Sequence, residues 1–157
     1  MSKIRLTRLF TFEMAHALQD YDGPCRNIHG HSYTLQVTII GTPLADAADP
    51  KNGMVMDFGD LKKLVNKTIV DELDHALLLR HDSPAELVEM LRKLNHKLVL
   101  TPYQPTCENM LLYFKTKLQQ VMPAHVQLHS LKLWETASSF ADGITAIHLP
   151  LPATQPA

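Results

Sequence analysis

The sequence has few of the features that mark secreted, membrane or nucleic-acid-binding proteins. It contains only two cysteines, Cys25 and Cys107, which is too few for a disulfide framework and favours a reducing cytoplasm. No apolar run is long enough to span a bilayer, and none near the N-terminus is typical of a signal peptide. The net charge is −1, without a basic run or an acidic tail, so we expect neither nucleic acid nor a membrane surface as a partner.

What remains is the composition of an ordinary globular domain. Of the 157 residues, 45% are hydrophobic and 20% are charged, which is enough chain and apolar surface to bury a core. We find no internal repeat and no low-complexity tract. We therefore expect a single domain over residues 1–149 and a mobile, proline-rich tail over residues 150–157.

Two segments near the N-terminus alternate between apolar and polar residues, as half-buried strands do. The first runs from Ile4 to His16, and the second from His31 to Ile40. The polar, turn-like residues 18–24 separate them, so we expect two long strands that are antiparallel neighbours. This pairing would bring His16 beside His29 and His31.

The middle of the chain has helical patterns. Apolar residues keep helical spacing from Leu61 to Leu73, and we expect this helix to close over residues 73–78. Ser83 begins a capping box with proline at the first helical position, which predicts a short helix to about Asn95. Residues 97–100 are a short extended piece. Thr106 is expected to cap a third helix that ends at Pro123.

The last elements complete an α+β layout. Residues 126–136 predict a strand, residues 137–143 a turn, and residues 144–149 a final strand. The order β-β-α-(α)-α-β-β favours a four-stranded antiparallel sheet with helices on one face. Such a sheet has exposed edges, and pairing between subunits is one way to cover them.

The pair His29 and His31 is the first candidate metal site. Residues two apart on a strand point to the same face, so both imidazoles could reach one ion, with His16 as a third ligand. Three neutral imidazoles leave the fourth position of a tetrahedral zinc open, as in catalytic sites. Cys25 lies four residues before His29 and could face the same ion or its ligand. The alternative interpretation is a turn with two solvated histidines.

Three further groups carry possible chemistry. Asp74 and His75 place an acid beside an imidazole at a helix end, where a His also favours the helix dipole. Glu135 lies in an apolar strand and could accept two parallel hydrogen bonds from a planar edge such as that of a pterin, but a surface Glu is an equal alternative. Thr106 and Glu108 fit a helix N-terminus, which already explains them structurally.

Together these residues resemble a known family. The resemblance covers about Leu6 to Leu149 and rests on six motifs in family order: Phe12-x-x-x-His16, Cys25-x-x-x-His29-Gly30-His31, Gly53-Met54-Val55-Met56-Asp57-Phe58, Leu73-Asp74-His75, Pro105-Thr106-x-Glu108 and Glu135-Thr136. The chain resembles the 6-pyruvoyltetrahydropterin synthase family, and within it the 6-carboxytetrahydropterin synthase branch of queuosine synthesis. That resemblance implies the tunnelling fold, in which three subunits close a barrel, two rings form a homohexamer, and each active site lies at a subunit interface.

The resemblance also implies roles for the candidate residues. His16, His29 and His31 would hold zinc beside the side chain of 7,8-dihydroneopterin triphosphate, and Cys25 would be the thiolate base. Asp74 and His75 would relay protons, while Glu135 would anchor the pterin ring in a pocket lined by Thr106 and Glu108. Triphosphate elimination, followed by carbon–carbon cleavage with release of acetaldehyde, would give 6-carboxy-5,6,7,8-tetrahydropterin.

Two features bear on what the resemblance implies for this chain. The spacing of four between Cys25 and His29 matches the carboxy-forming branch, whereas the pyruvoyl-forming branch, which makes 6-pyruvoyltetrahydropterin, usually has a longer gap. The segment 80–104 is longer than the corresponding segment expected in the compact bacterial members of the family.

Two hypotheses of other classes stay open. One is a non-catalytic protein that binds zinc or a pterin, which would need neither Cys25 nor the Asp74–His75 pair. The other is a zinc-dependent hydrolase, which would need a carboxylate base at the metal. Glu13 is the only acidic residue that we expect near the ligands, and it lies on the opposite strand face from His16.

Overall fold

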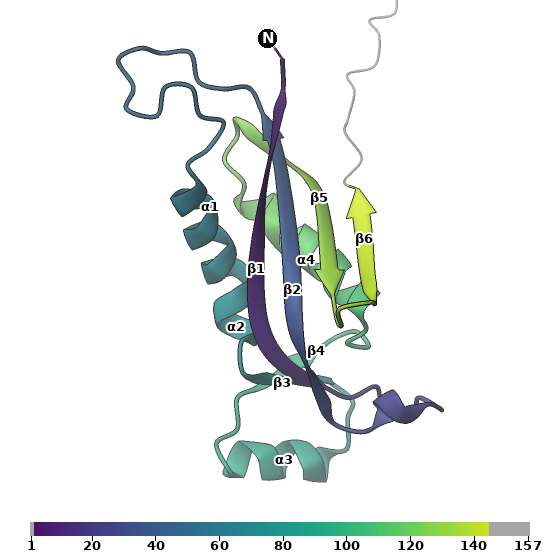
Figure 1. Ribbon diagram of the computed structural model, residues 1–157. Coiled ribbons are helices and arrows are strands. Elements are labelled where there is room, and N and C mark those ends of the chain that lie inside the picture. The colour runs from purple at the N-terminus through teal and green to yellow at the C-terminus, as the bar shows by residue number, and fades with distance from the viewer. Residues whose placement is uncertain (1, 145–157) are drawn as a thin grey trace, which may run out of the picture.

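Two long antiparallel strands, β1 (Ile4–His16) and β2 (His29–Gly41), form the centre of the fold (Figure 1). The computed structural model describes residues 2–144. Ile4 pairs with Gly41 at one end of the two strands, and His16 pairs with His29 at the other. The predicted pairing is confirmed, and it carries the histidines to one end of the sheet.

The described sheet has six strands in the order β4-β3-β1-β2-β5-β6. β5 (Val126–Trp134) and β6 (Phe140–Ile144) continue the antiparallel run beyond β2. The expected α+β class is therefore present, and β1, β2 and β5 match three of the four predicted antiparallel strands, whereas β6 lies before the position predicted for the fourth. Two strands were not expected in the sheet: β3 (Ala76–Arg80) and β4 (Leu98–Thr101), which extend it in parallel on the other side of β1.

The prediction that helical structure closes over residues 73–78 is wrong. The helix ends at Leu73, and the chain turns at His75, which has a positive φ of 60°. Residues 76–79 then form a strand that is buried throughout. A short apolar run of this kind has the same periodicity in a buried strand as in a buried helix, so length and spacing alone did not distinguish them.

Three helical elements follow one another before β3. α1 (Phe58–Val65) begins at Asp57, whose side chain accepts a hydrogen bond from the Gly59 N–H. A π-helical segment, Asn66–Val70, joins it to the short α2 (Asp71–Leu73). The later helix α4 (Cys107–Val121) is capped by Thr106 as predicted. α1, α2 and α4 lie on one face of the sheet (Figure 1).

The capping box predicted at Ser83 does not form. α3 (Ala85–Lys93) begins after Pro84, whose extended backbone makes it the N-cap residue, and no side chain caps this helix. Ser83 is buried instead, and its N–H donates to the carbonyl of Arg80 in a turn that follows β3. α3 lies at the end of the molecule near β3 and β4 (Figure 1).

The last hairpin differs from the prediction at its turn. β6 begins at Phe140, inside the segment predicted as a turn, because Phe140 pairs across the hairpin with Trp134 and their rings lie 5.7 Å apart. Such cross-strand aromatic pairs stabilise a strand against the turn preference of the Asp142–Gly143 dipeptide. The predicted final strand falls beyond Ile144, outside the described residues, as does the tail over 150–157.

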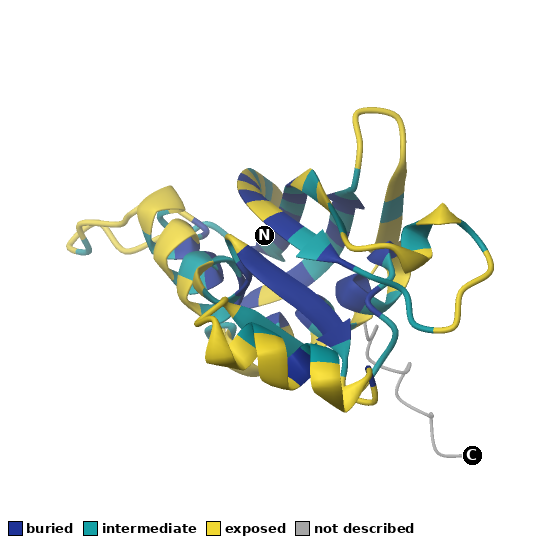
Figure 2. Ribbon diagram, turned by 90° about the horizontal axis from the view of Figure 1, so that it is seen from below, coloured by how far each residue is buried: buried dark blue, intermediate teal, exposed yellow. Residues whose placement is uncertain are grey.

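The core lies between the helices and the inner face of the sheet. Phe12 and Tyr33 stack with 5.3 Å between ring centroids, and Phe114 from α4 meets Phe12 edge-on at 6.4 Å. Figure 2 shows helices that are buried toward the interior and exposed on their outer sides. Among residues 2–144, no helix combines the length and the apolar character that a membrane span requires. Tyr33, which is fully buried in the core, lies two residues after His31 on β2.

Candidate active site

Three histidines meet at the end of the β1–β2 pair. His16 and His29 are direct cross-strand partners, and His31 lies opposite Met14, two residues before His16. All three side chains therefore point to the same face of the sheet. One nitrogen from each ring lies within 4.8 Å of the others, so the three could hold a metal ion.

The hydrogen bonds of two rings direct their free nitrogens toward each other. His16 donates from Nδ1 to the carbonyl of Pro105 at 2.8 Å, and His29 donates from Nδ1 to the carbonyl of Asn27 at 2.7 Å. A neutral imidazole with a proton on Nδ1 has a lone pair on Nε2. The two Nε2 atoms lie 3.1 Å apart. Two lone pairs at this distance repel unless a cation lies between them.

The third ring and a carboxylate converge on the same point. His31 Nε2 is buried and has no hydrogen-bond partner among the described residues. Glu135 Oε1 lies 3.3 Å from this nitrogen and 3.1 Å from His16 Nε2. Burial lowers the pKa of His31, although Glu135 opposes the shift, and this favours the neutral form that binds metals. The donor set therefore fits a cation, and backbone carbonyls orient two of its ligands.

Glu135 is ionised and held by a buried tyrosine. The adjacent His16 ring is the largest cause that lowers the pKa of Glu135, while partial burial opposes it. Tyr33 donates a hydrogen bond to Glu135 Oε1 at 3.3 Å. Burial and the neighbouring carboxylate raise the pKa of Tyr33 far above its usual value, so its hydroxyl remains a donor. Tyr33 was predicted as part of the β2 strand but not as part of the site.

A pocket of about 240 Å³ adjoins the histidines. It is lined by five of the predicted site residues, His16, Cys25, Thr106, Glu108 and Glu135, which come from separate parts of the chain. Cys25 lies in the short 3-10 helix Pro24–Arg26 and is half-buried. Thr106 and Glu108 lie at the start of α4, as predicted. The structure therefore brings the proposed base, anchor and ring-binding residues into one cavity.

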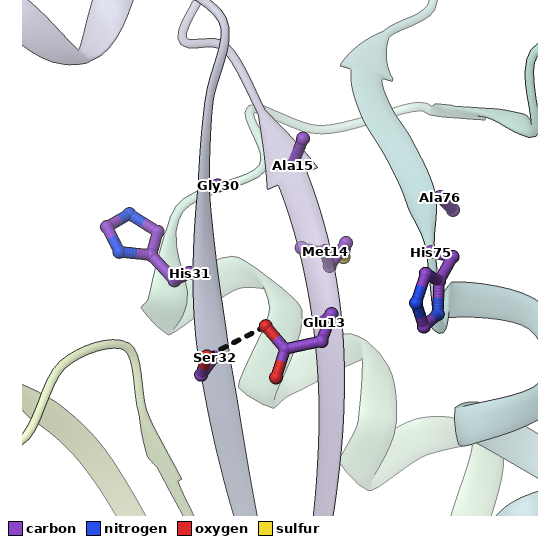
Figure 3. Close-up of a pocket in the computed structure, with 8 residues that line it drawn as sticks. All are labelled: Glu13, Met14, Ala15, Gly30, His31, Ser32, His75 and Ala76. Atoms are coloured by element: carbon purple, nitrogen blue, oxygen red, sulfur yellow. Dashed lines mark hydrogen bonds between the residues drawn. The ribbon is translucent and has the colours of Figure 1, made fainter.

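Asp74 and His75 lie elsewhere in the same subunit. Asp74 Oδ1 accepts the backbone N–H of Glu13 at 2.9 Å, and its Oδ2 lies 3.0 Å from His75 Nδ1. The Glu13 N–H is the largest cause that lowers the pKa of Asp74. His75 lines a second cavity of about 340 Å³, whose wall also includes His31, and the His75 side chain is 76% exposed. Figure 3 shows β1 and β2 between the His75 ring and the His31 ring.

The structure adds Cys107 to the pocket. This residue begins α4, and its thiol donates to the carbonyl of Leu133 at 3.3 Å. Burial raises the pKa of Cys107 to about 11, so its thiol stays protonated. Cys107 was not among the candidate site residues of the sequence. Its place immediately after Thr106 was the signal that could have placed it in the same pocket.

Comparisons with known proteins agree with this geometry. The family described as 6-pyruvoyl tetrahydropterin synthase matches residues 5–143. A 6-carboxy-5,6,7,8-tetrahydropterin synthase of Haemophilus influenzae is 36% identical over 140 residues, which cover 88% of this chain and 96% of that protein. The enzyme of the same name from Rickettsia conorii is 30% identical over 141 residues, which cover 88% of this chain and 99% of that protein.

A solved structure shows the same architecture. The 6-pyruvoyl tetrahydropterin synthase of Caenorhabditis elegans superposes with a TM-score of 0.64 and is 27% identical, covering 93% of this chain and 98% of that one. The family match and the relatives span most of the chain. The chain therefore belongs to the 6-pyruvoyl tetrahydropterin synthase family and has its tunnelling fold.

Proposed function

We propose that this protein is a zinc-dependent 6-carboxy-5,6,7,8-tetrahydropterin synthase. It converts 7,8-dihydroneopterin triphosphate with release of triphosphate and acetaldehyde, in the pathway to queuosine and other 7-deazapurines. The observation that carries the proposal is the convergence of three histidine nitrogens beside a pocket that also contains Cys25 and Glu135. The names of the relatives from Haemophilus influenzae and Rickettsia conorii support the same product.

His16, His29 and His31 would hold the zinc ion. Bound there, zinc would supply Lewis acidity toward the side-chain hydroxyls of the substrate and make the neighbouring C–H groups more acidic. The fit rests on the lone pairs at Nε2 of His16 and His29 and on the unpartnered, buried Nε2 of His31.

Cys25 is the proposed base. Its Sγ, as thiolate, takes a proton from the substrate side chain, and its position in the pocket wall keeps it close to the histidines without being one of the ligands. Both cysteines are free thiols, which fits the reducing cytoplasm expected from the sequence.

Glu135 is the proposed anchor of the pterin ring. Its carboxylate accepts N–H groups from the aminopyrimidinone edge, a charge-assisted contact with strong directional preference. Tyr33 donates to Oε1, which also lies 3.1 Å from His16 Nε2 and 3.3 Å from His31 Nε2, so Oε2 is the oxygen free to face the ring. Thr106 and Glu108 line the same cavity and complete the ring site.

Asp74 and His75 would complete the site from a second copy of the chain. The cavity of about 240 Å³ is smaller than the ~300–1,000 Å³ of most small-molecule sites, and His75 lines a different cavity. Asp74 holds His75 at the surface, where its imidazole can relay a proton in a neighbouring subunit's pocket.

Assembly into barrels and a homohexamer is part of this proposal, and the open edges of the sheet support it. β1 pairs with β3 only over Met14–His16, so on that side residues 4–12 have no strand partner among residues 2–144. The outer edge of β6 is likewise unpaired within the described part of the chain. Long open edges attract strands of other subunits, which closes a sheet into a barrel.

One observation favours a second candidate, a zinc-dependent hydrolase. The sequence suggested no carboxylate near the ligands except Glu13, which the structure places with Ser32, away from the cluster. That expectation was wrong, because Glu135 Oε1 lies against two of the histidines. A carboxylate beside a metal can activate water.

A single assay separates these functions. The purified, zinc-loaded protein is incubated with 7,8-dihydroneopterin triphosphate, and the products are identified by mass spectrometry. We expect 6-carboxytetrahydropterin with free triphosphate and acetaldehyde. A 6-pyruvoyl product would show that the protein is a 6-pyruvoyltetrahydropterin synthase. Loss of phosphate with an intact substrate side chain would show that it is a hydrolase. Unchanged substrate would show that it is a non-catalytic protein that binds zinc or a pterin.

A further inference from the structure

The loop that joins β1 to β2 carries the proposed base. We define this Cys25 loop as residues 17–28. The N–H of Leu18 donates to the carbonyl of Cys25 at 3.0 Å, so the start of the loop is tied to the residue that carries the thiol. Any group that anchors the start of the loop therefore also sets the position of Cys25.

The Gln104 side chain anchors the start of the loop by binding Gln19, 85 residues earlier in the sequence. Gln104 Nε2 donates to the carbonyl of Gln19 at 2.7 Å, and Gln104 Oε1 accepts the N–H of Gln19 at 3.1 Å. The side-chain amide of Gln104 thus binds both the backbone N–H and the backbone carbonyl of Gln19, as a neighbouring strand would. Only a primary amide offers the donor and the acceptor that this arrangement needs.

Gln104 is itself held at the edge of the pocket. Its carbonyl accepts the Asn109 Nδ2 at 3.0 Å and the N–H of Thr106 at 2.8 Å, which fixes it to the first turn of α4. The next residue, Pro105, provides the carbonyl that orients His16. Residues 104–106 therefore connect the Cys25 loop, one metal-binding histidine and the pocket wall.

A second contact reaches the same loop from the start of the long segment 80–104. Arg80 lies 3.1 Å from Asp20, but the Asp20 side chain is 74% exposed and Arg80 also pairs with Asp82. Exposed ion pairs contribute little, typically ~0–1 kcal/mol. The two hydrogen bonds of Gln104 are partly buried and therefore make the stronger restraint.

We propose that Gln104 is a positioning residue that holds the Cys25 loop so that the Cys25 thiol faces the pocket. This inference rests on the proposed role of Cys25 as the base. A misplacement of ~1 Å in a reacting group can cost about 100-fold in rate, so a loosened loop should lower kcat without weakening pterin or zinc binding. The end of the long segment 80–104 thereby gains a function at the site.

Two variants and one control test the proposal. Gln104→Ala removes both bonds to Gln19. Gln104→Glu keeps the shape and the acceptor for the Gln19 N–H, but it sets a carboxylate oxygen against the Gln19 carbonyl. Gln120→Ala removes an exposed glutamine side chain from the other end of α4 and serves as the matched control. Circular dichroism and zinc content establish that each variant is folded and loaded.

Three measurements are made on the full-length, zinc-loaded protein. Hydrogen exchange of the Gln19 amide and alkylation of Cys25 by iodoacetamide report on the loop without any need for turnover. Steady-state kinetics report kcat and KM. We expect both Gln104 variants to show faster exchange, faster alkylation and a kcat lower by roughly 10–100-fold, with KM unchanged and the control like the wild type.

Other outcomes overturn the proposal. Wild-type exchange at Gln19 in Gln104→Ala would show that the amide does not hold the loop. Faster exchange with wild-type kcat would show that the loop does not need to be held for catalysis. If the wild-type protein does not turn over the pterin, the proposed function fails, and the alkylation rate alone decides: no change in Cys25 reactivity rejects the positioning role.

Discussion

The His16 imidazole donates from Nδ1 to the carbonyl of Pro105 across a separation of 89 residues, at 2.8 Å and in a buried position. This one bond fixes both the tautomer and the ring orientation of His16, and so directs its Nε2 lone pair at the other two histidines. A carbonyl from the loop before α4 thus prepares a ligand on β1. The proposed metal site and the proposed substrate pocket share this loop, since Thr106, which lines the pocket, follows Pro105.

Zinc binding by the three histidines is the first prediction. We expect His16→Ala, His29→Ala and His31→Ala each to lose stoichiometric zinc and activity together, because two remaining imidazoles make a poor site. Inductively coupled plasma mass spectrometry of the purified variants measures the zinc content per subunit. His96→Ala, which alters an exposed histidine outside the site, is the control. Full zinc content in all three ligand variants would exclude the proposed site.

The second prediction separates the base from the ligands. Cys25→Ala should keep zinc and the oligomer but lower kcat by about 10²–10⁴-fold, the usual effect of removing a general base. Metal analysis, light scattering and steady-state kinetics measure the three properties. Near-normal turnover would assign the proton transfer to another group, and loss of zinc would make Cys25 a fourth ligand.

The third prediction concerns the recognition of the ring. Glu135→Gln replaces an acceptor by a donor that opposes the ring N–H, and a buried mismatch of this kind costs about 1–3 kcal/mol. The affinity for a non-reactive pterin should therefore fall at least roughly tenfold, with zinc content unchanged. Calorimetry measures this against Glu108→Gln, for which we expect a smaller loss.

Two results would contradict the assignment of Glu135. Unchanged pterin affinity in Glu135→Gln, or a larger loss in Glu108→Gln, would show that the ring lies in another orientation. Loss of zinc in Glu135→Gln would instead make the carboxylate a metal ligand, as its 3.1 Å contact with His16 Nε2 permits.

The fourth prediction tests sites shared between subunits. Cys25→Ala and His75→Ala should each have a strongly lowered kcat alone, because each removes a group with a proposed role in proton transfer. Cys25 and His75 line different cavities of one subunit, so a shared site would take them from two subunits. Mixed oligomers refolded from both variants should regain part of the wild-type rate, since some pockets then combine an intact Cys25 with an intact His75. Sedimentation should show a hexamer, and an active monomer or a mixture without activity would contradict the shared site.

The fifth prediction concerns the two thiols. The pKa of Cys107 is raised to about 11, so at pH 8 only ~0.1% of it is the reactive thiolate, while Cys25 is half-buried at the pocket wall. Mass spectrometry after brief iodoacetamide treatment should find one modified cysteine in the native protein and two after denaturation. Modification of Cys107 in the native state would show that α4 opens at its first turn.

Local patterns predicted the centre of the fold and the histidine site. Alternation in residues 4–16 and 31–40 specified the faces of β1 and β2, and the antiparallel pairing brought His16 opposite His29. The same alternation contained Tyr33, two residues after His31, although its hydroxyl contact with Glu135 depends on the end of β5 and was not visible from spacing.

The errors lie where distant contacts override local preference. The Leu77–Leu79 run became a parallel strand because β1 and β4 flank it, and neither neighbour is close in sequence. Phe140 entered a strand because Trp134 pairs with it. Asp74 and His75 were recognised by sequence, but their separation from Cys25 follows only from the path of the chain around β1.

The chemistry of the three-nitrogen cluster has a consequence inside the cell. Imidazole ligands bind divalent ions in the Irving–Williams order, in which copper(II) exceeds zinc. The cluster of His16, His29 and His31 contains no thiolate ligand that would alter this preference. The supply of available metal during folding, rather than the intrinsic affinity of the site, therefore decides which ion it acquires. Protein produced in copper-rich medium should carry copper where the proposed function needs zinc.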